Sequence, residues 1–150
     1  MDFSFRGELS DQKAAELSSL VDAAVNVVQS KYDSFQAGEM TEDEAKIAAA
    51  KAVEAMRYRG QEYFWINDMN SVIVMHAAKP KLNGQNLASM QDPNGVTIFP
   101  EFVKMVRANS AGFVAYQWPK AGSETPVDKL SYVKGFTPLG LGCWYRRLYG

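Results

Sequence analysis

The sequence predicts an α+β fold in which a long helix packs on or beside an antiparallel sheet. Apolar residues recur every three to four positions in the first third of the chain, and the period changes to two after Gly60. The strands that follow are joined by short turns, which favours antiparallel pairing. With 150 residues and 47% hydrophobic content, the chain can bury the core of one domain. We expect that domain to span residues 1–150, with a long helix in 1–36 and a core in 41–150.

Two helices are predicted before the first strand. The first covers residues 8–35, where leucine, valine and alanine side chains keep a three-to-four spacing. The second begins after Thr41, which forms a capping box with Glu44 because each side chain can accept a hydrogen bond from the other residue's backbone N–H. Gly60 is the expected stop.

A hairpin, a third helix and three further strands complete the predicted order. The hairpin pairs residues 63–67 with 72–77, and one helical turn is expected near 87–90. A helix over 98–108 precedes two long strands in "AGFVAYQWPKAGSETPVDKLSYVKGFTPLG", and a last strand should follow Gly140. This order matches a PAS-like sensor core.

Composition excludes several classes of function. The formal charge of −1 gives no strong attraction to nucleic acid or to an anionic membrane. The one cysteine, Cys143, allows no internal disulfide and no multi-cysteine zinc site, and a single histidine allows no histidine-rich metal centre. No apolar run reaches the roughly 18–20 residues of a membrane-spanning helix. We therefore expect a soluble protein or the soluble part of a larger one, without metal or cofactor.

Aromatic side chains with polar tips recur on the predicted strands. Because side chains alternate along a strand, Tyr63 and Trp65 share one face of the first strand, and Tyr116 and Trp118 share one face of a later strand. The returning strand of the hairpin carries His76. Such rings on three or four strands predict a concave aromatic cage, with hydroxyl and N–H groups that can hold a small carboxylate.

A carboxylate in such a cage also needs a cation beside it. Arg57, at the end of the second helix, is the expected main charge partner, and Lys79 and Lys129 are its rivals. Tyr132 is expected to complete the cage. The alternation along its strand puts Lys129 on the face opposite to Tyr132, which argues against Lys129 unless a β-bulge changes the alternation.

Plainer interpretations of the same residues stay open. The four tyrosine and tryptophan rings on strands can be ordinary core packing, and His76 can be a buried structural histidine. Arg57 can be a solvated residue that favours the dipole of its helix. Lys79 can be loop surface.

The motifs around the hairpin resemble the single Cache domain, the extracytoplasmic sensing module of bacterial methyl-accepting chemotaxis receptors and some sensor kinases. The family pattern has an "RY" helix end, a "YFWI-D-N" hairpin, "MH-x-x-KP-x-L-x-G-x-N", "DPNG", "GFV-Y-W-PK" and "K-SYVK-F-P". In this chain the motifs lie at residues 57–58, 63–70, 75–86, 92–95, 112–120 and 129–138. The resemblance covers nearly the whole chain, and it strengthens the assignment of the aromatic residues to a pocket as a group.

The resemblance implies a function and a location. Many members of the family bind small carboxylates such as acetate, propionate, pyruvate or lactate. The domain would lie in the periplasm, as part of an inner-membrane receptor, and its long first helix could pack against a second copy in a homodimer. The expected protein is a sensor and not an enzyme.

The last residues depart from the family pattern, which ends "P-W-G-W-V-x-G-x-G-V-Y". From Pro138 this chain reads "PLGLGCWYRRLYG". Residues 139–150 can be encoded so that omitting one base gives W-G-W-V-A-G-I-G-V-Y-M. We hypothesise a one-base shift of the reading frame here and assign no function to Cys143, Arg146 or Arg147.

Other functions remain as alternatives to the chemotaxis sensor. The domain could belong to a membrane histidine kinase, or it could be an interaction module that binds no ligand. An enzyme would need His76 with Asp68 or Asp92 as an acid–base pair. None of the nucleophile, metalloprotease or phosphate-loop motifs accompanies them.

Overall fold

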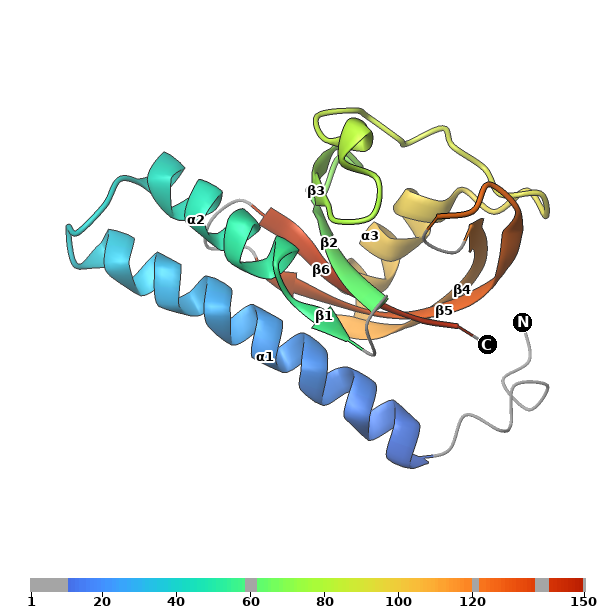
Figure 1. Cartoon of the computed structure of the whole chain (residues 1–150), viewed down its shortest axis with the longest axis horizontal. Coiled ribbons are helices and arrows are strands. Elements are labelled where there is room, and N and C mark those ends of the chain that lie inside the picture. Colours follow the sequence, from blue (N-terminus) through green and yellow to red (C-terminus); the bar gives the residue numbers. More distant parts are fainter. Residues whose placement is uncertain (1–10, 59–61, 120–121, 137–140, 150) are drawn as a thin grey trace.

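The computed structural model describes residues 11–58, 62–119, 122–136 and 141–149. Two helices come first, α1 (Asp11–Gln36) and α2 (Glu42–Glu54), and they pack against each other as an antiparallel pair (Figure 1). The predicted bounds of the first helix agree closely with these, and so does the start of the second. The second helix ends at Glu54, well before the expected stop at Gly60, and Arg57–Tyr58 form a short strand instead of the end of the helix. The expected start of the first helix at residue 8 lies outside the described residues.

All pairings within the sheet are antiparallel, so the predicted fold class is confirmed. The strand order of the sheet is β1-β2-β6-β5-β4, and β3 pairs with β2 in addition. The strands span Arg57–Tyr58 (β1), Glu62–Asn67 (β2), Ile73–His76 (β3), Ala111–Pro119 (β4), Pro126–Phe136 (β5) and Leu141–Tyr149 (β6). The last strand in sequence therefore lies in the middle of the sheet, between β2 and β5.

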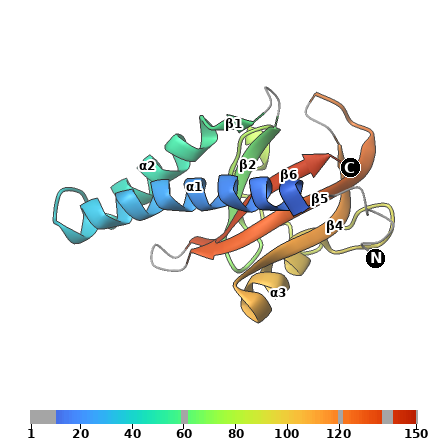
Figure 2. The same cartoon turned by 90° about the horizontal axis from the view of Figure 1, so that it is seen from below.

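The two faces of the sheet are covered by different helices. α1 runs across one face, over β5 and β6 (Figure 2), with the side chains of Val21, Ala24 and Val28 fully buried. The opposite face carries α3 (Ile98–Asn109), which contacts β4, β5 and β6. Buried side chains therefore lie on both faces of the sheet, and those beneath α3 include most of the rings predicted to form the aromatic cage.

The polar loop after the hairpin differs in detail from the prediction. The helical turn expected near residues 87–90 is a simple turn, in which the Met90 N–H donates to the Leu87 carbonyl oxygen at 3.2 Å. A short 3₁₀ helix, η1 (Pro80–Leu82), lies earlier in the loop instead. Proline suits this position because the first N–H of a helix needs no partner within it.

The capping box of α2 is confirmed. Thr41 Oγ1 accepts the Glu44 N–H at 3.1 Å, and Glu44 Oε1 accepts the Thr41 N–H at 2.8 Å. The hydrogen bond from the Thr41 backbone, and after it a side-chain hydrogen bond with Thr41, lower the pKa of the Glu44 carboxyl. A lowered folded-state pKa means that the contribution is present above the ordinary glutamate pKa and is lost as the pH falls through the folded-state value.

We expect Thr41→Ala to lower the free energy of unfolding by about 1 kcal/mol, since one amide at the start of α2 loses its acceptor. Urea denaturation measures the change. Thr41→Ser, which keeps a hydroxyl oxygen at the cap, is the matched control and should lose much less. Equal losses in both variants would mean that the methyl group and not the cap stabilises this helix.

Candidate functional site

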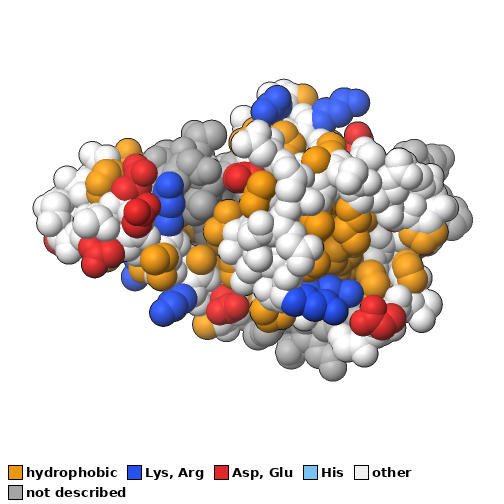
Figure 3. Space-filling view, turned by 90° about the horizontal axis from the view of Figure 1, so that it is seen from above, with side chains coloured by type: hydrophobic (Ala, Val, Ile, Leu, Met, Phe, Trp, Pro, Cys, Tyr) orange, Lys and Arg blue, Asp and Glu red, His pale blue; other side chains and the backbone are white. Residues whose placement is uncertain are grey.

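A closed aromatic cluster fills the space between the sheet and α3. The gap at its centre is nowhere wide enough for a water molecule. The rings around it come from two strands of the hairpin, from β4 and from α3: Trp65, His76, Phe99, Phe102, Tyr116 and Trp118. Every one of these side chains is buried. In the view from above (Figure 3), no part of His76 reaches the surface.

The hairpin contributes three of the predicted residues. Strand alternation puts Tyr63 and Trp65 on one face of β2, and His76 is paired with Trp65 in the β2–β3 register. The His76 ring stacks on Trp65 with centroids 5.9 Å apart and 23° between the planes. It lies 5.1 Å from the Tyr63 ring. The structure therefore brings these three side chains together.

β4 and β5 contribute the polar wall of the cluster. Tyr116 is paired with Lys129 and Val114 with Ser131, so Lys129 and Ser131 lie on the same face of the sheet as the Tyr116 ring. Tyr116 Oη and Ser131 Oγ form a hydrogen bond of 2.7 Å. Lys129 is only 1% exposed. The strand alternation that argued against Lys129 in the sequence in fact favours it.

Tyr132, which was expected to complete the cage, lies away from the cluster. It lies on the other face of β5, paired with Phe113, and the two ring centroids are 5.0 Å apart. The structure does not bring it to the cluster with Tyr116. The reason is the two-residue period of the strand: once Lys129 belongs to the α3 side, Tyr132 must belong to the α1 side.

The two remaining candidates lie at the border of the cluster. Lys79 Nζ is 5.7 Å from the centroid of the Trp118 ring, a cation–π distance. Trp118 in turn lies 5.7 Å from His76. Arg57 belongs to β1, where its backbone pairs with Tyr63. The side chain of Arg57 lies outside the described part of the chain.

Sequence reasoning missed the contribution of α3. Phe99 and Phe102 contact each other edge to face at 5.3 Å, and Phe102 contacts Tyr116 at 5.0 Å in the same manner. They form the apolar wall opposite the polar strands. Their spacing of three residues on the inner face of an amphipathic helix was visible in the sequence. That pattern is equally typical of plain core packing, so it gave no separate signal.

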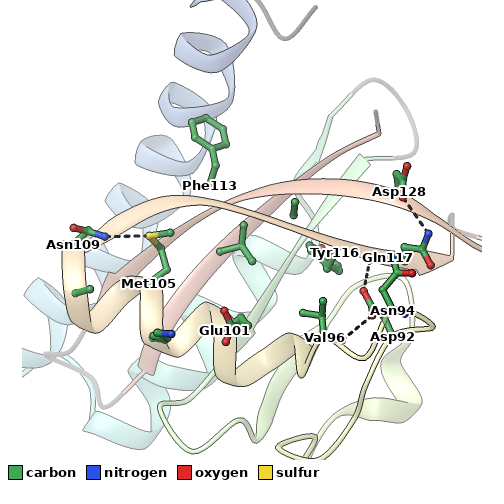
Figure 4. Close-up of a pocket in the computed structure, with 14 residues that line it drawn as sticks. Asp92, Asn94, Val96, Glu101, Met105, Asn109, Phe113, Tyr116, Gln117 and Asp128 are labelled. Carbon is green, nitrogen blue, oxygen red and sulfur yellow. Dashed lines mark hydrogen bonds between the residues drawn. The ribbon is translucent and has the colours of Figure 1, made fainter. Parts of the chain in front are cut away.

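A larger groove of about 470 Å³ lies on the outer side of Tyr116, between α3 and the edge strand β4 (Figure 4). Glu101 and Asp128 line it, so its charge disfavours an organic anion despite the presence of Lys104. It is also open to solvent, which weakens any charge interaction within it. The closed cluster is the better candidate site although it is smaller.

The two carboxylates considered for acid–base chemistry have structural tasks. Asp68 Oδ1 accepts the N–H groups of Asn70 and Val72 in the hairpin turn. Asp92 Oδ1 accepts two N–H groups of its own turn, and its Oδ2 accepts the Gln117 N–H at 2.9 Å. Among the described residues, no group of three His, Cys, Asp or Glu side chains could hold a metal ion. What the cluster offers instead is a set of donors, namely phenol, indole, imidazole and ammonium groups, that suit an anion.

A sheet with a long helix on one face and a closed polar-aromatic cluster on the other is the arrangement of a sensory ligand-binding domain. Comparisons with known proteins agree. The family described as Single Cache domain 2 matches residues 9–143. The methyl-accepting chemotaxis protein McpP of Pseudomonas putida is 39% identical over 134 residues, which are 89% of this chain and 25% of McpP.

Two solved structures are similar over nearly their full lengths. A periplasmic sensor domain of a chemotaxis protein is 44% identical, with a TM-score of 0.88, and the match covers 92% of this chain and 95% of that one. A Cache chemosensory domain that recognises carboxylic acids is 36% identical, with a TM-score of 0.90 and coverage of 95% and 97%.

The chain belongs to the Single Cache domain 2 family, a family of sensor domains of methyl-accepting chemotaxis proteins. The matches place it among non-catalytic periplasmic sensor domains, as predicted. The chain spans about a quarter of the length of McpP. Within the described residues, no helix is both long and apolar enough to cross a membrane.

Proposed function

We propose that this domain senses small organic acids, of the acetate, propionate, pyruvate or lactate class, and that the acid binds in the aromatic cluster. The observation that carries the proposal is the position of Lys129, a cation 1% exposed on the same sheet face as Tyr116 and Ser131. An ammonium group in so dry a place attracts an anion strongly, because little water screens its charge. A carboxylate bound beside it would accept a charge-assisted hydrogen bond.

The size of the cavity supports an acid of few atoms. No water molecule fits between the rings, whereas pockets for drug-sized ligands begin at roughly 300 Å³. The rings must also move apart slightly to admit even a small acid. Phe99 and Phe102 would contact its carbon chain, while Tyr63 and Tyr116 would donate to its oxygens. The relative that recognises carboxylic acids supports the same chemistry.

The fold also supports a route for the signal. β5 and β6 contact α3 on the ligand side and α1 on the other side. A ligand that spreads the rings displaces these strands, and binding shifts the population between two positions of α1 if it favours one of them. In the complete receptor, which we propose is anchored in the inner membrane, α1 would carry this change toward the membrane. A homodimer formed through α1 would double the signal.

A thermal-shift screen of two- to four-carbon acids tests the proposal. An acid at a hundred times its dissociation constant should stabilise the fold by about 2.7 kcal/mol, which for a domain of this size raises Tm by roughly 5–10 °C. In Tyr63→Phe the shift should require roughly tenfold more acid, because one donor to the charged ligand is lost.

Tyr32→Phe is the matched control. The Tyr32 hydroxyl lies on α1, where it accepts a bond from Gln36 Nε2 at 2.9 Å, so its removal should leave the response unchanged. If no acid, amine or amino acid shifts Tm, a module that binds no ligand becomes the better description. If acids bind equally well to both variants, the acid binds outside the cluster.

A further inference from the structure

The loop of residues 77–84 closes the aromatic cluster on one side. It leaves β3 directly after His76, makes a tight turn in η1 and brings Lys79 over the Trp118 ring of β4. It therefore joins two strands that are not neighbours in the sheet. An acid that enters from this side must displace the loop.

His76 holds this loop with two hydrogen bonds. The Lys79 backbone N–H donates to His76 Nδ1 at 2.9 Å, and the His76 backbone N–H donates to Asn83 Oδ1 at 2.8 Å. The far end is held differently, by a backbone bond of 2.7 Å from the Gly84 N–H to the Ile73 carbonyl oxygen. Only the near end depends on the state of an ionisable side chain.

The bond from Lys79 fixes the tautomer of His76. A backbone N–H can only donate, so Nδ1 must present its lone pair and the proton of the neutral ring must sit on Nε2. The ring cannot turn over easily, because it is 1% exposed and stacked on Trp65. A second proton could bind only at Nδ1, and it would point at the Lys79 N–H and break that bond.

We propose that His76 is a positioning residue that latches the 77–84 loop only while its imidazole is neutral, so that the domain binds its acid more weakly when the periplasm is acidic. The inference rests on the proposed function of the cluster. The site then responds to pH as well as to the acid. Asn83 holds the loop at a second point.

The charges around His76 also favour its neutral form. Among the described side chains, the titratable groups of the cluster and its loop are Tyr63 from β2, Tyr116 from β4, Lys129 from β5 and Lys79 from the loop itself, and the α3 residues that line the cavity are phenylalanines. The two lysines disfavour a further positive charge. A bound carboxylate would favour an imidazolium, but Lys129 already supplies the balancing cation.

Amide hydrogen exchange in the ligand-free domain tests the latch by itself. The protection of the Lys79 amide, corrected for the intrinsic rate, should fall about tenfold between pH 7.5 and 5.5, one unit on either side of the usual histidine pKa of about 6.5. The Gly84 amide is the internal control and should keep its protection. Loss at both amides together would show unfolding of the whole loop and would overturn the proposal.

Two variants separate the nitrogens of the ring. His76→Asn places an amide oxygen near the position of Nδ1, so the Lys79 amide should stay protected at both pH values. His76→Gln reaches the position of Nε2 and lacks the acceptor near Lys79, so this amide should be unprotected at both. A structural role of His76 alone would give the same exchange in both variants.

Calorimetry with pyruvate, which stays ionised over this range, then measures the effect on binding. The dissociation constant should rise about tenfold from pH 7.5 to 5.5 in the wild type and stay constant in His76→Asn. Unchanged or tighter binding at pH 5.5 in the wild type would overturn the latch while leaving the acid site intact. Absence of binding at either pH would refute the proposed function, and the exchange experiment would still decide the latch.

Discussion

Lys129→Met is expected to abolish acid binding while the domain still folds. Methionine keeps the length and apolar stem of the side chain while removing its charge. The loss of a buried charge partner should weaken the affinity for a carboxylate by at least about a hundredfold. The variant should still fold, because methionine keeps the volume of the side chain at a position that is only 1% exposed.

Calorimetry with the acid found in the screen and urea denaturation of the free domain measure the two effects. Lys134→Met is the matched control on the same strand: Lys134 bonds Asp22 of α1 at 2.6 Å in an exposed pair, and its loss should change stability by about 1 kcal/mol or less. It should not change affinity. Equal affinity in wild type and Lys129→Met would move the charge partner to Lys79 or Arg57.

Replacing residues 139–149 by WGWVAGIGVYM is expected to raise stability by about 5 kcal/mol, or roughly 10–20 °C in Tm. Position 146 of β6 stands between Phe64 of β2 and Tyr132 of β5, and position 147 is paired with Ser131. Neighbouring positions of a strand belong to opposite faces, and both faces of this sheet are covered by helices. The present sequence gives charged residues at both positions, whereas the shifted frame gives glycine and valine.

The coding DNA offers a direct check, because the shifted frame requires a particular set of codons. Calorimetric melting of the two proteins is the physical check. A substitution of residues 137–138 alone, which precede the altered segment, serves as the control for the exchange itself. Equal melting temperatures for the present and the restored endings would refute the frame hypothesis.

Local patterns predicted most of the fold. The capping box at Thr41 and Glu44, the change of period after Gly60 and the turn within residues 68–71 were all readable, because each depends on neighbours only a few residues apart. The same patterns could not predict the order of the strands. The central place of β6 depends on contacts between β2 and β6, which are far apart in the sequence.

The sequence predicted only those groups of site residues that follow from the alternation of side chains along a single strand. Tyr63 with Trp65 and Tyr116 with Trp118 could be grouped, since each pair lies within one strand. The register between β4 and β5 decides which side chains of β5 lie on the same face as Tyr116. That register puts Lys129 in the cluster and Tyr132 on the opposite face. The α3 wall was missed because a helix with a buried face gives the same pattern whether or not a ligand lies against it.

The position of β6 also has a consequence for how the domain is made. Until residues 141–149 have been delivered, β2 and β5 each lack a partner along one side, and no strand pairing joins the two halves of the described sheet. Exposed strand edges recruit other chains and lead to aggregation. Export of this domain should therefore depend on holding chaperones until the final strand arrives, and a pause in translocation just before it should be the most damaging place to stop.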